Sequence, residues 1–274
     1  MYMIERKMSL YNFFKTKVVK ILGSAALLLM GTVYADCEIC SSEQCNISRL
    51  QIGGSYTRAN IKIDGQSSFD GNLGGVLGSY EYRPWNSFYG GLKAAWRLGE
   101  TENSDAHRQL TYVDVQERIG YTYAPCSNGW SLTVFSGFGY RYLGHRLKQS
   151  GESIKFDYNE FYVPVGCISE YFFCCNWSLG LNFTWMPQVY PTVEISPLQG
   201  AYWKLENTLG NVLVEVPLTY FFTQDRRYAL VFNPFYERWE DGQSTAKASS
   251  GEELGLPKNS YNLWGVELNV VFSF

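Results

Sequence analysis

Apolar and polar residues alternate with a period of two along most of the chain after about residue 47. The segment 131–141 is typical, because its even positions are large and apolar except for Ser136, and most of its odd positions are small or polar. Residues two apart on a β-strand share a face. Each such segment therefore predicts a strand with one apolar face and one polar or small face.

The alternation predicts ten strands with a regular set of connections. The expected strands are 48–60, 72–83, 88–100, 110–124, 130–145, 154–173, 177–186, 209–223, 228–240 and 261–274. Short connections at 84–87, 126–129, 174–176 and 224–227 alternate with longer, more polar ones near 61–71, 101–109, 146–153, 187–208 and 241–260. An even strand number with short periplasmic turns and long outer loops is typical of bacterial outer-membrane barrels. We therefore expect an all-β fold, a transmembrane antiparallel up-and-down barrel, over 48–274.

The apolar face distinguishes a membrane barrel from a soluble sandwich, which would also show short alternating strands. In the segment 177–185 the apolar row begins at Trp177 and ends at Trp185. Aromatic residues at both ends of such a row are typical of the two membrane interfaces. The alternation thus favours a lipid-facing surface.

The first 35 residues predict a cleaved signal peptide. Five basic residues precede an apolar run over 21–33, and Val33 and Ala35 stand at the −3 and −1 positions of a cleavage site. A retained membrane helix is the alternative, but about 13 apolar residues fall short of the roughly 20 that a bilayer requires. We expect residues 1–35 to be removed and 36–47 to form a periplasmic segment that contains cysteines.

Composition and charge narrow the partners. The chain has 21 Tyr, 17 Phe, 8 Trp and 26 Gly, and only 18% of its residues are charged, as aromatic girdles and glycine-rich strands would require. The net charge of −3 and the lack of a basic patch in the sequence argue against a nucleic-acid partner. The expected partner is the lipid bilayer of the outer membrane.

The end of the chain carries the most specific motif. An unbroken alternating apolar row is formed by Trp264, Val266, Leu268, Val270, Phe272 and Phe274. This row resembles the C-terminal signature that the barrel-assembly machinery of Gram-negative bacteria recognises. The resemblance implies that this machinery is a partner and that the row is an assembly signal.

The face opposite the lipid row carries charges of both signs. The expected pore-lining residues are Lys93, Arg97, Asp114, Arg118, Arg141, Glu160, Glu215 and Glu267. In a narrow ten-stranded lumen such side chains either cross it as a hydrogen-bonded plug or line a thin channel. We expect most of them to be paired for structural reasons. Glu117 would point at lipid, so a bulge or a shifted register is expected there.

One enzymatic alternative rests on architecture. The ten strands resemble the omptin type of outer-membrane protease, which uses an Asp-x-His pair and a separate acidic pair at the outer rim. Asp105 and His107 have the first spacing but lie in the second expected outer loop instead of the fourth, and no matching acidic pair is present. No other catalytic, metal-binding or phosphate-binding motif is found in the sequence, so neither enzymatic activity nor a cofactor or metal is expected.

The cysteines gather on one side of the predicted topology. Six of the seven, namely Cys37, Cys40, Cys45, Cys126, Cys174 and Cys175, fall in expected periplasmic segments. That compartment is oxidising, so disulfides within the chain or to neighbours are favoured over a metal or redox role for the Cys37-x-x-Cys40 pair. Cys167, within a strand, is interpreted as a small apolar residue.

A small aromatic-rich barrel with many periplasmic cysteines resembles the envelope proteins of Chlamydiae-type bacteria, and more narrowly the Protochlamydia outer membrane protein family. The resemblance implies a pore-forming role. The sequence therefore predicts a porin-like channel for small solutes. The alternatives are a structural envelope protein linked by disulfides to other cysteine-rich envelope proteins, and an omptin-like protease.

Overall fold

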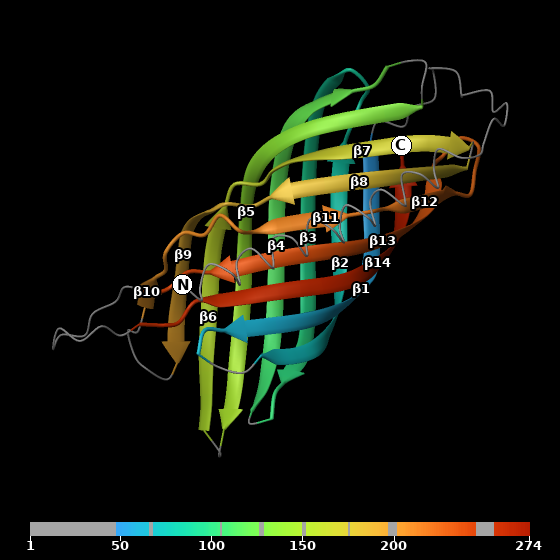
Figure 1. Ribbon diagram of the computed structural model, residues 1–274. Helices are drawn as coiled ribbons and strands as arrows, with labels where there is room; N and C mark the ends of the chain where they lie inside the picture. Colours follow the sequence, from blue (N-terminus) through green and yellow to red (C-terminus); the bar gives the residue numbers. More distant parts are fainter. Residues whose placement is uncertain are drawn as a thin grey trace, which may run out of the picture. The chain divides into compact units, whose positions relative to one another are not determined.

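The computed structural model describes residues 48–65, 68–104, 106–125, 129–149, 152–174, 176–196, 202–244 and 255–274, which lie in one compact unit, Ile39–Phe274. The described residues form β-strands joined by turns (Figure 1). The strands are β1 (Ser48–Ile63), β2 (Phe69–Tyr82), β3 (Ser87–Glu102), β4 (His107–Tyr123), β5 (Trp130–Gln149), β6 (Glu152–Tyr162), β7 (Val165–Cys174), β8 (Trp177–Trp185), β9 (Gln188–Ser196), β10 (Tyr202–Lys204), β11 (Val212–Glu215), β12 (Leu218–Phe221), β13 (Tyr228–Asp241) and β14 (Asn259–Ser273). None of the described segments is a helix long and apolar enough to cross a membrane.

Three of the ten barrel strands are each made of two successive elements. Proline interrupts the pairs β6 and β7, β8 and β9, and β11 and β12, at Pro164, Pro187 and Pro217. Proline has no N–H for the ladder, but its carbonyl still accepts: Val163 donates to Pro187 at 3.1 Å and Gly180 to Pro217 at 2.7 Å. The short β10 is an addition that pairs with β9. The predicted ten-stranded antiparallel barrel is therefore confirmed.

The barrel closes between its first and last strands. β1 pairs with β14 in one continuous register, from Arg49 opposite Ser273 to Ile63 opposite Asn259. Beyond this register, Ser48 and Phe274 exchange two backbone hydrogen bonds of 3.0 Å. Closure removes the free edges that a membrane-embedded sheet cannot leave unpaired. The start of β1 and the end of β14 consequently lie at the same rim, which is the periplasmic one in a barrel of this kind.

The predicted outer loop over 187–208 is wrong in part, because it contains β9 and β10. β9 pairs with β6 as far as Lys155 opposite Ser196, and β10 pairs with β9 in turn. Alternation predicts a strand only where an apolar lipid-facing row is present, and the exposed positions of β9 include Glu194 and Ser196. A strand that continues above the membrane needs no such row, so the pattern missed it.

The wall therefore has a lipid-facing band and, above it, an overhang that includes the outer end of β4 and the hairpin of β5 and β6. The outward row of β14 is apolar from Trp264 onward, and the six residues of this row from Trp264 to Phe274, just beyond the strand, are 38–68% exposed. On β4 the outward row is polar from Thr111 to His107, at the outer end. β5 has 20 residues, roughly 65 Å at about 3.3 Å per residue, whereas the apolar band of such a barrel is about 25 Å tall. The hairpin of β5 and β6 accordingly projects from one end of the barrel (Figure 1).

Glu117 corrects a second prediction. β4 pairs with β3 and β5 without any register shift, so the expected bulge is absent from this described strand. Glu117 points outward and is exposed, opposite Leu92 and Phe138 on the neighbouring strands. A carboxylate thus lies within the apolar band, between Val115 and Ile119.

Replacing this carboxylate should stabilise the barrel in lipid. A charged residue on the lipid face is unfavourable near mid-bilayer, so Glu117→Leu is expected to raise the free energy of unfolding by about 1 kcal/mol. The measurement is denaturant-induced unfolding in phospholipid vesicles, followed by tryptophan fluorescence. The matched control is Glu100→Leu, an outward glutamate of β3 near the outer end, with an expected change within about 0.5 kcal/mol. A Glu117→Leu barrel no more stable than wild type would place this residue outside the hydrocarbon.

Candidate functional site

The predicted interior residues all project into the lumen. Lys93 and Arg97 come from β3, Asp114 and Arg118 from β4, Arg141 from β5, Glu160 from β6, Glu215 from β11 and Glu267 from β14. Seven of them are buried and Lys93 is half-buried. They share this face because each occupies the parity of its strand that opposes the lipid row. Their inward orientation agrees with the alternation, and their partners show what they do there.

A first charged layer crosses the lumen from β3. The Arg97 guanidinium lies 2.8 Å from Glu237 of β13 and 3.4 Å from Glu267 of β14. Lys93 Nζ lies 2.6 Å from Glu215. Asn233 joins the two pairs, donating to Glu215 at 3.2 Å and to Glu267 at 2.9 Å. Strands on opposite sides of the barrel are thereby connected through its interior.

A second charged layer is centred on Arg141. Its guanidinium lies 3.0 Å from both Glu160 and Asp241 and stacks 4.1 Å from the ring centroid of Trp239. All four side chains are fully buried. Charges this deep are tolerated only when paired and hydrogen-bonded. The layer therefore fills the lumen as a packed ionic cluster.

Apolar and aromatic side chains fill the outer half of the lumen around these clusters. The buried cluster includes Tyr112, Leu143, Tyr162, Phe235 and Tyr261. The cavity found among such side chains measures only about 10 Å³, roughly the space for a single water. These side chains therefore pack around a cavity that is too small for a solute.

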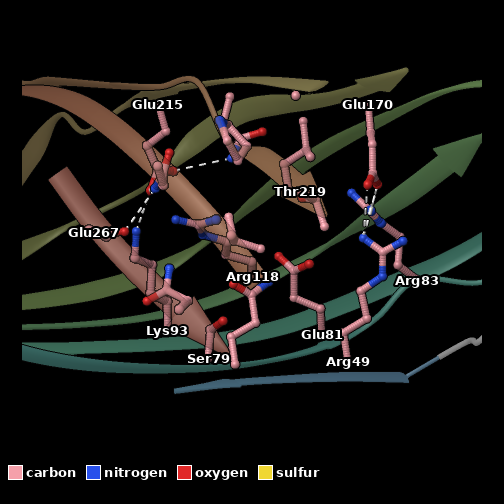
Figure 2. A pocket seen from close by; sticks show the side chains of 18 of the residues that line it. Arg49, Ser79, Glu81, Arg83, Lys93, Arg118, Glu170, Glu215, Thr219 and Glu267 are labelled. Carbon is pink, nitrogen blue, oxygen red and sulfur yellow. Dashed lines mark hydrogen bonds and ion pairs between the residues drawn. The ribbon is translucent and has the colours of Figure 1, made fainter. Parts of the chain in front are cut away.

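The periplasmic half contains a larger cavity of about 80 Å³ (Figure 2). Near the rim, Glu170 pairs with Arg49 at 3.0 Å and also with Arg83, and it accepts from Ser178 at 2.9 Å. Lys93, Arg118, Glu215 and Glu267 line the deeper wall. Figure 2 shows these groups pointing toward one another from opposite strands.

Sequence reasoning missed several residues of these clusters. Asp241 was assigned to a loop and Arg83 to the end of a strand, while Trp239 and Tyr162 were given no role. The signal for two of them was available, because Glu237, Trp239 and Asp241 continue one period-two row. Tyr162 of β6 donates to Asp114 of β4 at 2.5 Å, across the intervening β5, a contact that no local pattern indicates.

The weak catalytic candidates do not gather into a site. Asp105 lies outside the described residues. His107 Nδ1 lies 3.3 Å from Glu102, and the two side chains are 75% and 70% exposed. The other histidine, His145, is buried in the lumen beside Tyr261, with Nε2 3.3 Å from its hydroxyl.

The cysteine prediction falls almost entirely outside the described structure. Cys37, Cys40, Cys45, Cys126 and Cys175 lie outside the described residues, and only the backbone of Cys174 is described, at the end of β7. Cys167 is a free thiol on the outward face of β7, between Val134 and Phe183 of the adjacent strands. That place fits a small apolar residue.

A closed antiparallel barrel with an apolar outer band and paired charges inside defines an outer-membrane β-barrel protein. A family model agrees: residues 24–187, more than half of the chain, match the outer membrane protein beta-barrel domain. The chain belongs to that family and is a protein of the bacterial outer membrane.

Several solved structures are similar to the chain. The outer membrane protease OmpT from Escherichia coli has a TM-score of 0.57 and 12% identity, covering 86% of this chain and 99% of OmpT. The translocator domain of the autotransporter NalP from Neisseria meningitidis has a TM-score of 0.46 and 8% identity, covering 98% of each chain. The toluene transporter TbuX from Ralstonia pickettii has a TM-score of 0.42 and 7% identity, covering 84% of this chain and 90% of TbuX. Among curated proteins no match was found.

Removing the centre of the second charged layer should destabilise the barrel. Arg141→Met keeps much of the side-chain volume but leaves Glu160 and Asp241 without their cation, so the free energy of unfolding should fall by about 3 kcal/mol. The control is Arg238→Met, whose partner Glu240 lies on the same strand at a partly exposed position, with an expected loss below about 1 kcal/mol. Denaturant titration in vesicles measures both. Equal losses would show that the buried cluster is not what holds the lumen together.

Proposed function

We propose that this outer-membrane barrel is closed to solutes at rest and that its working surface is the overhang of its sheet above the membrane. The observation that supports this is the filled lumen. Two ionic layers cross the lumen, and the aromatic cluster packs around them. A general porin would instead need a continuous aqueous channel.

The porin-like channel predicted from the sequence is the competing function. It would require Arg97 and Arg141 to leave four buried carboxylates, those of Glu237, Glu267, Glu160 and Asp241. Breaking one buried pair typically costs about 3–5 kcal/mol. An open state would therefore be a rare one unless a ligand or partner stabilised it.

The overhang has the character of a docking or scaffolding surface. Two of its exposed cations are paired locally with partly buried carboxylates, Lys155 with Asp157 and Lys258 with Glu240, each at 2.9 Å. Mixed, locally compensated charge favours neither polyanions nor polycations. A protein or envelope polymer that binds through shape complementarity is therefore the better candidate partner.

The alternative function is that of a structural protein, linked by disulfides to other cysteine-rich envelope proteins. The narrower resemblance to the Protochlamydia outer membrane protein family belongs to this alternative. Both rest on cysteine placement in the sequence. The proposed partners remain the bilayer, the barrel-assembly machinery and these envelope proteins.

We further propose that the protein has no protease activity. The acidic pair that an omptin-like mechanism needs beside the Asp-x-His motif is missing from the sequence. The described contact of His107, an exposed pair with Glu102, provides no buried and oriented base of the kind that general-base catalysis uses.

Conductance in planar bilayers tests the closed state. The wild-type protein should show no steady conductance, whereas a variant with Ala at Arg97, Arg141 and Trp239 should conduct because it lacks the largest side chains of both layers. The control places Ala at Arg58, Arg238 and Trp264, which face outward, and should stay silent. Heat-modifiable mobility on SDS gels verifies that each barrel is folded. Steady ohmic conductance of the wild type would establish the porin instead.

The proposed role of the assembly machinery is tested at the end of the chain. Phe274→Ser should lower the amount of protein in the outer membrane severalfold, because it removes the terminal aromatic of the exposed β14 row. Phe222→Ser is the matched control, since Phe222 is also an exposed phenylalanine and follows the periplasmic end of β12. Equal membrane levels of the two variants would mean that the row is not an assembly signal.

A further inference from the structure

The cavity in the periplasmic half of the lumen contains two ionic groups that the charged layers do not use. Arg118 of β4 and Glu81 of β2 both line it, and Figure 2 shows the two side chains reaching into the same space. Other charged residues of the wall form ion pairs: Lys93 pairs with Glu215, and both Arg49 and Arg83 pair with Glu170. The cavity is therefore not a uniform ion-pair network.

Arg118 is held in place without a counter-ion. Its side chain is only 4% exposed, and its Nε and Nη2 donate to the neutral amide oxygen of Gln116 at 3.0 and 2.6 Å. Its guanidinium stacks 4.8 Å from the ring centroid of Phe135. Among the described residues no carboxylate oxygen comes within 4.0 Å of it. These contacts fix the guanidinium plane and leave Nη1 available to the cavity.

Glu81 is the matching anion on the same wall of the cavity, two strands from Arg118, with Gly91 between them in the cross-strand row. Its described hydrogen bond comes from the buried Tyr89 hydroxyl, at 3.2 Å, and no cation lies within ion-pair distance of it in the described part of the chain. Glu81 is half-buried, and a charge withdrawn from water without a partner is unfavourable. A cation and an anion that line one cavity without forming an ion pair are both better satisfied when a ligand bridges them.

The size of the cavity limits the ligand. Its volume is about 80 Å³, and one water-sized atom needs about 10–15 Å³ on this measure. The space therefore holds about five to eight non-hydrogen atoms. Since Arg49 and Arg83 stand at the periplasmic ends of β1 and β2 and the outer half is filled, the periplasm is the side from which a solute arrives.

We propose that this cavity is a binding site for a small zwitterion, an α-amino acid of the size of glycine or alanine, that enters from the periplasm. The carboxylate of the ligand accepts hydrogen bonds from Arg118, and its ammonium group donates to Glu81. A simple anion would leave Glu81 unpaired and repelled, and a simple cation would do the same to Arg118. The site goes beyond the proposed closed barrel, because binding at a blind cavity requires no passage through the lumen.

The test is isothermal titration of the purified full-length barrel in detergent with glycine, acetate and methylammonium. We expect saturable binding of glycine, at least tenfold tighter than that of either monovalent ion. Arg118→Gln and Glu81→Gln should each weaken glycine binding at least tenfold, whereas Arg58→Gln, an outward residue of β1, should leave it unchanged. Heat-modifiable mobility on SDS gels shows whether each variant is folded. If Arg118→Gln does not fold, Arg118→Lys, which keeps the charge, takes its place. Weaker glycine binding by Arg118→Lys then supports the site.

Three outcomes would overturn the proposal. The first is the absence of saturable glycine binding, which would make the cavity a water-filled packing defect. The second is acetate binding as tight as glycine binding, which would make it a plain anion site. The third is unchanged glycine binding in a folded Arg118 variant. None of these results depends on conductance, so the closed-barrel proposal stands or falls separately.

Discussion

The hydrocarbon of a bilayer offers no hydrogen-bond partner, and this constraint governs the structure. Every backbone N–H and C=O in the lipid-facing band must be paired within the wall. The continuous register between β1 and β14, completed by Ser48 and Phe274, satisfies it by leaving the sheet without a free edge. Where the strands of the outer half diverge, side chains replace the ladder: Gln188 and Thr208 donate to the Glu240 carbonyl at 3.1 and 2.7 Å, and Asn211 accepts from the Glu240 N–H at 2.8 Å.

The same shortage of water acts on the inside. A ten-stranded barrel is narrow, so a charge placed on its inner face meets other side chains before it meets solvent. Arg97 and Arg141 each find two carboxylates and an aromatic ring, and the lumen is filled as a result. The two surfaces that we propose to be functional lie at the ends: an overhang that faces outward, and a cavity near the periplasmic rim in which Arg118 and Glu81 have no ionic partner among the described residues.

Period-two alternation was sufficient to predict the barrel, its ten strands and the inward orientation of Arg97, Arg141 and their neighbours, because lipid imposes an apolar row on each strand. It could not predict which charges meet. Arg97 and Glu237 are 140 positions apart, and their contact depends on the diameter and register of the closed sheet. The alternation also failed where lipid imposes nothing, as in β9 above the membrane. At Glu117 the alternation predicted the correct outward orientation. The bulge or shifted register expected there, because a carboxylate is unfavourable in lipid, was wrong.

The proline interruptions give the wall an uneven mechanical character. Pro164, Pro187, Pro217 and Pro234 lie on four successive strands of the barrel, and each omits one N–H from the ladder. The sector from β1 to β5, by contrast, is built of long strands paired without a register shift. Under lateral pressure from the membrane, the proline-containing sector should deform more than the sector from β1 to β5, which should stay rigid. The barrel should therefore deform mainly along one flank, and the carboxylates that pair with the cations of the lumen, Glu160, Glu215 and Glu237, lie on that flank.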